Sequence, residues 1–366
     1  MSTLREFSQA LYYFHSIKAG EYKSIETLCS VAHENFMEEF DKIDDGEFKY
    51  INLAGATTSE RKKQLKMWLD EKMSRIDSLV KHESDNDLSA APKLYELLFD
   101  KSNGLPKYKH VTSTLAARTD FFRVRDAEKY VLYDRKGMFV LSDDLENKVG
   151  AYRFNPSGYA CLYLASNLYL AWEECRRPNF DTVNFSRFQN TKEVEVLDLT
   201  IHDEYKYREH FLMSYLALLC GAKTTDKDKH NFQYVVPQMM MKVLASSQRK
   251  LESRKEDKLC KKKPCKIIAG IRYMSSRRFD QKDLLFDDKR LTIAYVFPQH
   301  PHDDKHDVCP YLASLFWLTE PRTYFLFKTH RFNFFTRSAY VSSYQDSLFY
   351  QLENELSKEK LAKYDK

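Results

Sequence analysis

The stretch RFNPSGYACLYLASNLYLAWEE, residues 153–174, fixes the expected local order of turn, strand and helix at the centre of this 366-residue chain. Asparagine, proline, serine and glycine at 155–158 are typical of a turn. The run ACLYLA that follows has the length and apolarity of a buried strand. Leu168, Ala171, Trp172 and Cys175 then recur at helical spacing, and Ser166 is placed to cap that helix.

The predicted helix ends on two carboxylates, Glu173 and Glu174. Helical geometry places Glu173 well away from the apolar stripe and Glu174 at its margin, close to Ala171. A carboxylate at the edge of a core is costly unless another group partners it. We therefore expect Glu174 either in a structural ion pair or facing a ligand.

The rest of the chain divides into a helical part and a mixed part. Helical spacing marks the first 80 residues and the segment 93–99, and the turn formers DKSNGLPKYKH predict a domain boundary near Pro106. This gives a helical N-terminal module, 1–110, and a second domain, 111–366. In the second domain, expected strands (193–201, 266–275, 291–298 and 323–335) mix with expected helices (207–219, 234–246 and a last one over 345–363). Two further short strands around residues 134–137 predict a hairpin.

Strands and helices in this second domain do not alternate regularly, which favours an α+β class over a doubly wound sheet. The chain carries 9 glycines and no glycine-rich phosphate loop, Walker-type loop or Gly-x-Ser-x-Gly elbow. The net charge of +5 tolerates an anionic ligand without requiring nucleic acid. The lysine-rich run 249–266 has acidic residues mixed in and no interleaved aromatics, which favours a solvated loop. No nucleic-acid partner is expected.

The start of the sequence lacks the pattern of a secretory signal, and its apolar runs are too short to span a bilayer. The 7 scattered cysteines are read as free thiols, so we expect a cytoplasmic protein with no membrane partner. A metal-like cluster, His300, His302, His306 and Cys309, has two prolines nearby, and a polar surface loop is the favoured interpretation. We expect no metal.

Several motifs in a fixed order resemble the RES domain family, named for its arginine, glutamate and serine. They are Arg153-Phe154-Asn155-Pro156 with Gly158, Tyr163-Leu164-Ala165, Glu174, the earlier FFRVR with Arg123, AGIRYMSS with Ser275, and AYVFP. The resemblance covers roughly residues 119–298. Met274 stands where the family has a proline, which leaves a choice between Ser275 and Ser276. Ala294 stands where an asparagine is common.

RES proteins are bacterial toxins with a core that resembles ADP-ribosyltransferases, and they consume NAD. The resemblance implies an ADP-ribosyltransferase-like mixed sheet with flanking helices, and a chain that acts as a toxin or defence effector. It implies cleavage of the nicotinamide–ribose bond by phosphorolysis, giving nicotinamide and ADP-ribose 1″-phosphate, with inorganic phosphate as co-substrate. A cognate antitoxin or regulatory protein is the implied partner.

The resemblance also implies a set of site residues. Glu174, Arg123 and Ser275 take the catalytic positions, and Arg153, Tyr163 and Asn155 the NAD-binding positions. The residues alone also allow ordinary roles: Tyr163 as core, Arg123 and Arg153 in ion pairs, and Ser275 as a small polar strand residue. Two other functions stay open, transfer of ADP-ribose to a protein or nucleic acid and a non-catalytic NAD-binding or interaction module.

Overall fold

The computed structural model describes residues 2–14, 22–51, 57–85, 88–100, 105–108, 110–127, 131–139, 152–156, 159–222, 232–253, 267–275, 292–299, 308–324 and 344–365. The chain forms two compact units. The first unit contains Met1–Ser113, Tyr152–Pro156 and Glu195–Phe279, and the second contains Thr114–Ala151, Ser157–Val194 and Asp280–Lys366. Each unit is described by itself.

Helices make up most of the first unit. They are α1 (Leu4–Phe14), α2 (Ile25–Lys42), α3 (Thr58–Ser84), α4 (Ala90–Leu98), α6 (Arg208–Cys220) and α7 (Val235–Ser253), with short 3-10 turns at Asp45–Tyr50 and Phe232–Tyr234. Side-chain caps fix several helix starts: Ser24 caps α2, and Thr57 with Glu60 forms a capping box at α3.

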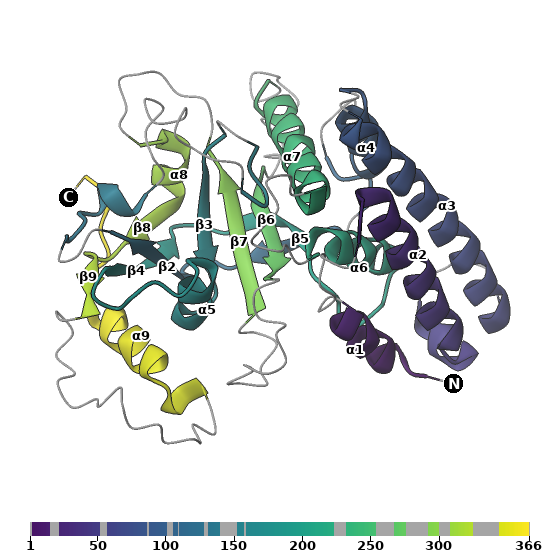
Figure 1. Ribbon diagram of the computed structural model, residues 1–366, viewed down its shortest axis with the longest axis horizontal. Coiled ribbons are helices and arrows are strands. Elements are labelled where there is room, and N and C mark those ends of the chain that lie inside the picture. Colours follow the sequence, from purple (N-terminus) through teal and green to yellow (C-terminus); the bar gives the residue numbers. More distant parts are fainter. Residues whose placement is uncertain are drawn as a thin grey trace. The chain divides into compact units, whose positions relative to one another are not determined.

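Helix α6 forms the centre of this helical group, with α2 and α3 packed against it (Figure 1). It is apolar around most of its circumference, as expected for a buried helix. Phe211 of α6 contacts the rings of Phe7 and Phe40, and Tyr215 contacts Phe36. The N-terminal helices and α6 therefore share one aromatic core, although about 200 residues separate α1 from α6 along the chain.

Two parallel strands complete the first unit, β5 (Val194–Leu199) and β6 (Ile268–Met274). Asp198 of β5 and Arg272 of β6 form an ion pair with an N–O distance of 2.7 Å. Helix α7 packs on β6. Strand β1 (Thr112–Leu115) contains the point at which the chain first passes into the second unit.

The second unit is built on an antiparallel sheet in the order β7 (Ile293–Pro298), β3 (Cys161–Ala165), β2 (Asp120–Asp126), β4 (Val183–Asn190) and β8 (Phe316–Leu318), with β9 (Arg322–Thr323) also paired to β4. Phe121 packs edge to face on the rings of Tyr295, Phe297 and Phe316 within its core.

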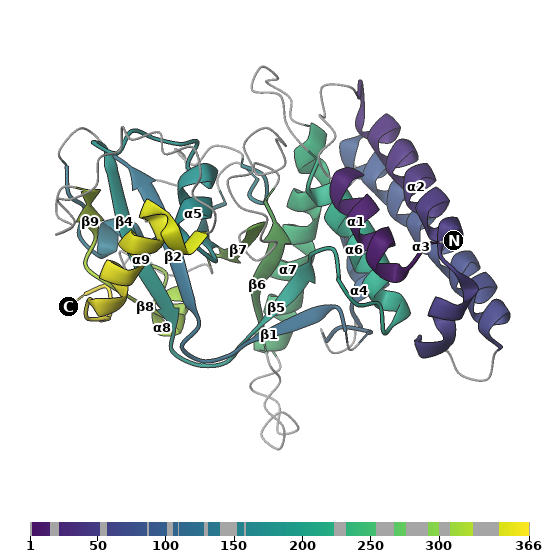
Figure 2. The same cartoon turned by 90° about the horizontal axis from the view of Figure 1, so that it is seen from below.

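Helices α5 (Leu168–Glu174) and α9 (Leu348–Lys358) pack against each other on this sheet, α5 on β2 and β3 and α9 on β4 (Figures 1 and 2). The unit also contains α8 (Pro310–Leu315) and 3-10 turns at Lys136–Met138 and Tyr344–Asp346.

The α+β class predicted from the sequence is confirmed. The prediction of a hairpin around residues 134–137 is wrong for the described residues of this segment, 131–139. Residues 131–135 form no strand, and Lys136–Met138 is a 3-10 turn. The chain first passes from the first unit to the second after Ser113 and then returns to the first unit twice. None of the described helices is long and apolar enough to cross a membrane.

Candidate functional site

Arg123 lies in the middle of β2 and is half-buried in the second unit. Its Nη1 donates a hydrogen bond of 3.1 Å to the backbone carbonyl of Tyr163 on the neighbouring strand β3. Its Nε is buried and has no partner among the described residues, and within that part of the chain no carboxylate pairs with its guanidinium. Burial, and next the charge of Arg125, lower the pKa of Arg123 to about 9. The guanidinium remains charged at neutral pH in surroundings that favour a bound anion.

Glu174 closes α5, the helix that follows β3, and its side chain is half-buried. Asn167 caps this helix by accepting from the Leu170 amide at 2.8 Å, so the predicted cap at Ser166 is wrong by one residue. Cys175, directly after Glu174, lies close enough to Arg123 for the pKa values of the two groups to be coupled. Arg123 bonds Tyr163 across the strand pair β2–β3, and Glu174 lies at the end of α5, the helix that packs on these two strands.

Glu173, near the end of α5, lies in the core and not on the exposed side that the helical spacing predicts. Its side chain was expected to point away from the core, yet the residue is only 3% exposed. Its Oε2 accepts a 2.8 Å bond from Nε of Arg177, and its Oε1 is buried without a partner among the described residues. The reason is local: Arg176 and Arg177 adopt left-handed backbone angles, φ 65° and 52°, and turn the chain back on the helix. Glu173 is therefore held by Arg177 and is not available to a ligand.

Arg153 and Asn155 belong to the first unit. Arg153 Nη1 donates to the carbonyls of Cys220 and Ala222, each at 2.9 Å, at the C-terminal end of α6, where a cation is favoured by the helix dipole. Its guanidinium also lies 5.6 Å from the ring centroid of Tyr234. Asn155 is 1% exposed, and its carbonyl accepts from the Tyr152 amide at 3.0 Å.

Ser275 also belongs to the first unit, directly after β6, and is fully buried. Phe154, beside Asn155, packs on Tyr273 of β6 with a ring-centroid distance of 4.5 Å, so the segment 152–156 adjoins the end of β6. Met274 Sδ accepts from the Ile201 amide at 3.4 Å. Ala294, the other departure from the RES pattern, is buried in β7 of the second unit opposite Ala165. Ser276 lies outside the described residues.

Glu353 is the titratable residue near α5 that the sequence interpretation missed. It lies on α9 and accepts from the Leu168 amide at 2.6 Å and from the hydroxyl of Tyr344. Burial raises its pKa to about 7. A signal was present in the sequence, because Phe349, Leu352, Glu353 and Leu356 follow the i, i+3, i+4, i+7 spacing of a buried helix stripe.

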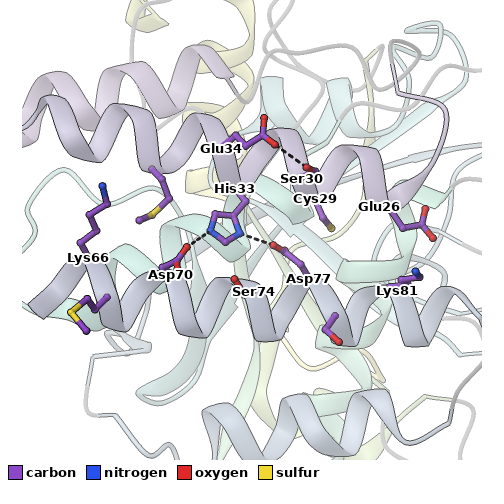
Figure 3. A pocket seen from close by; sticks show the side chains of 13 residues that line it. Glu26, Cys29, Ser30, His33, Glu34, Lys66, Asp70, Ser74, Asp77 and Lys81 are labelled. Atoms are coloured by element: carbon purple, nitrogen blue, oxygen red, sulfur yellow. Dashed lines mark hydrogen bonds and ion pairs between the residues drawn. The ribbon is translucent and has the colours of Figure 1, made fainter. Parts of the chain in front are cut away.

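An open cavity of about 860 Å³ lies between α2 and α3 of the first unit and contains none of the predicted site residues. Figure 3 shows His33 at its centre, with Nδ1 2.8 Å from Asp77 and Nε2 3.1 Å from Asp70. Both imidazole nitrogens are therefore engaged. Burial raises the pKa of the Cys29 thiol, so this cysteine is not an activated nucleophile.

Within the described ranges, no group of three or more His, Cys, Asp or Glu residues is arranged to hold a metal. The metal-like histidines His300, His302 and His306 lie outside those ranges. Cys309 is buried immediately before α8.

Comparison with known proteins yields one distant relative. No family model matches the chain, and no solved structure matches it. Over 231 residues the chain is 23% identical to a protein described as "Putative toxin YopC" from Bacillus subtilis (strain 168), an alignment that covers 58% of this chain. The chain spans about half the length of this curated relative, 48%. At this distance the comparison shows similarity to a protein described as a toxin, and the RES resemblance stays a prediction.

Proposed function

We propose that this chain is an NAD-consuming enzyme that cleaves the nicotinamide–ribose bond by phosphorolysis and acts as a toxin or defence effector. The observation that carries the proposal is the guanidinium of Arg123, charged, half-buried and without a carboxylate partner in the described part of the chain. Such a group favours a phosphate or pyrophosphate, which accepts the forked hydrogen bonds of arginine.

Glu174 supplies the second requirement of the reaction. When the bond between C1″ and nicotinamide breaks, its electron pair leaves on the nicotinamide nitrogen and positive charge develops on the ribose. A half-buried carboxylate beside that carbon stabilises this charge. A phosphate oxygen then forms the new bond to C1″, which gives ADP-ribose 1″-phosphate. Nicotinamide leaves as a neutral molecule, so the reaction needs no general acid.

The remaining roles follow the family resemblance. Tyr163 would stack on nicotinamide or orient Glu174, while Arg153 and Asn155 would bind NAD and Ser275 would bond the carboxamide or phosphate. Arg153 already bonds two carbonyls of its own unit, so its role in binding would be added to a structural one. The relative described as a toxin supports the biological role, and an ADP-ribosyltransferase-like core is part of the same proposal.

The test follows nicotinamide release from NAD by the purified full-length chain and its variants. Glu174→Gln should lower kcat by about 10²- to 10³-fold, because the amide cannot stabilise developing positive charge. Glu355→Gln is the matched control and should keep the wild-type rate. Glu355 lies on α9 and is partly exposed, and its salt bridge joins it to the exposed Lys358.

Two results would overturn the assignment. An unchanged rate in Glu174→Gln would remove Glu174 from the site, and no nicotinamide release by the wild type would reject the proposed activity. Label from NAD appearing on a protein or nucleic acid, in place of free sugar phosphate, would instead identify a transferase.

A further inference from the structure

The N-terminal end of α5 is held by a carboxyl group from a distant part of the chain. Glu353 Oε1 accepts from the Leu168 amide at 2.6 Å, 185 residues away in sequence. The hydroxyl of Tyr344, in the 3-10 turn before α9, donates to the same oxygen. Glu353 therefore joins three elements of the second unit: α5, α9 and the turn at Tyr344–Asp346.

Helix α5 depends on such contacts because it has 7 residues. A helix this short is not stable on its own, and its first amides lack intrahelical acceptors. Side chains supply two of these acceptors, Glu353 for Leu168 and Asn167 for Leu170. Phe349 of α9 supports the same helix, with ring-centroid distances of 5.1 Å to Tyr169 and 5.3 Å to Trp172.

Helix α9 is itself fixed on the sheet at its C-terminal end. Arg187 of β4 donates through Nη2 to the carbonyls of Ser357 and Glu359, and its Nη1 pairs with Asp120. Arg322 of β9 pairs with Glu359 at 2.6 Å. Leu352 and Leu356 are fully buried. Because α9 is anchored in this way, a bond from α9 can hold the start of α5 at a defined place.

We propose that Glu353 is a positioning residue that holds α5, and through it Glu174 at the far end of that helix, in the orientation that the reaction needs. This inference rests on the proposed function for its effect on catalysis. The link between Glu353 and α5 can be tested independently of NAD.

The protonation state of Glu353 makes the packing around this link dependent on pH, because burial penalises the ionised carboxyl. Among the described residues, the groups that face its carboxyl are the Tyr344 hydroxyl and the Leu168 amide, with the charge of Asp120 acting at longer range. Burial, opposed by the two hydrogen bonds and aided by Asp120, raises its pKa to about 7. Because folding raises the pKa, Glu353 contributes stability to the folded chain that is fully present below the ordinary value near 4.5. This stability is lost as pH rises through about 7, because the ionised carboxyl is then buried, although the bonds from Leu168 and Tyr344 favour the ionised form.

The first arm of the experiment measures kcat and KM for NAD across pH 5.5 to 8.5 in full-length wild type, Glu353→Ala, Glu353→Gln and the control Glu355→Ala. Glu353→Ala should lower kcat by about 10²-fold with little change in KM, because misplacing a reacting group impairs chemistry more than binding. Glu353→Gln keeps the acceptor for Leu168 but cannot ionise. Its kcat should be close to that of the wild type. If the wild-type rate falls above pH 7 because Glu353 ionises, that fall should be absent in Glu353→Gln.

The second arm reads the position of α5 without substrate. Trp172 lies on α5 against Phe349, so its fluorescence, in a background with Trp68 and Trp317 replaced by phenylalanine, reports the contact with α9. The emission should change with a midpoint near pH 7 in the wild type. It should be independent of pH in Glu353→Gln.

The two arms separate the possible failures. If the wild type releases no nicotinamide but Trp172 titrates as expected, the proposed function fails and the link between Glu353 and α5 stands. The positioning role is rejected if Trp172 emission does not titrate in the wild type, or if it titrates in the same way in Glu353→Gln. It is also rejected if Glu353→Ala keeps the wild-type kcat. If Glu353→Ala does not fold, the pH dependence of kcat and of Trp172 emission is compared between wild type and Glu353→Gln. Identical pH dependence in the two proteins would reject the positioning role.

Discussion

Arg123 and Arg153 carry the same side chain into different surroundings. The guanidinium of Arg153 bonds two carbonyls at the end of α6 and lies over an aromatic ring. Within the described part of the chain, Arg123 donates to one backbone carbonyl and has a buried Nε without a partner, and a second cation, Arg125, is nearby. At the residue scale, the anion-binding role is therefore better supported for Arg123 than for Arg153.

Inorganic phosphate is the probe for this difference. Arg123→Gln should weaken phosphate binding by about 10- to 100-fold in titration calorimetry, the loss expected for a hydrogen bond to a charged group. Arg123→Lys should recover only part of the affinity, because lysine keeps the charge and loses the fork. Arg118→Gln, at an exposed turn before β2, is the control. Equal affinity in Arg123→Gln and the control would contradict an anion site at Arg123.

At the scale of elements, the sequence predicts long periodic helices and buried strands well, because burial patterns are local. Strand β3, helix α6 and helix α9 were all expected close to where they lie. The end of α5 differs from the prediction, because Glu173 is buried and bonded to Arg177. This bond depends on the left-handed backbone of Arg176 and Arg177. The partner of Glu353 was not predictable either, since spacing marks a residue as buried but does not say what it meets 185 residues away.

A second prediction belongs to the pair α2 and α3. His33 bridges these helices through Asp77 and Asp70, and the hydrogen bond to Asp77 is the main cause that raises its pKa. Tyr215 of α6 donates to the other oxygen of Asp77. A histidine whose pKa is raised by folding contributes stability fully below its ordinary value of about 6.5, and this contribution is lost as pH rises through the raised value.

Urea unfolding of wild type and His33→Gln at a series of pH values measures this contribution. The difference in the free energy of unfolding should be largest in mildly acidic solution and should shrink as pH rises above about 6.5. Ser30→Ala, on the same helix and in the same cavity, serves as a control without a titrating group. A difference that stays constant with pH would show that His33 is not held as a cation between the two carboxylates.

At the scale of the whole molecule, the two units interleave along the chain. The N-terminal helices do not form a core of their own, because Phe7, Phe36 and Phe40 contact Phe211 and Tyr215 of α6. The first unit is therefore completed by residues 152–156 and 195–279.

This organisation predicts that the N-terminal region cannot be removed as a module. A chain of residues 111–366 would expose the apolar surface of α6 and should aggregate or lose helix content beyond that of the deleted segment. Circular dichroism and size-exclusion chromatography, with the full-length chain as reference, measure both effects. A monodisperse truncated chain with the remaining helices intact would contradict a shared core.

The measurement that tests the central claim most directly is product analysis of NAD incubated with the full-length chain, with and without inorganic phosphate. We expect nicotinamide release that requires phosphate, with one ADP-ribose 1″-phosphate formed for each nicotinamide, and loss of both products in Glu174→Gln. Intact NAD under both conditions, or release of free ADP-ribose at the same rate without phosphate, would contradict phosphorolysis.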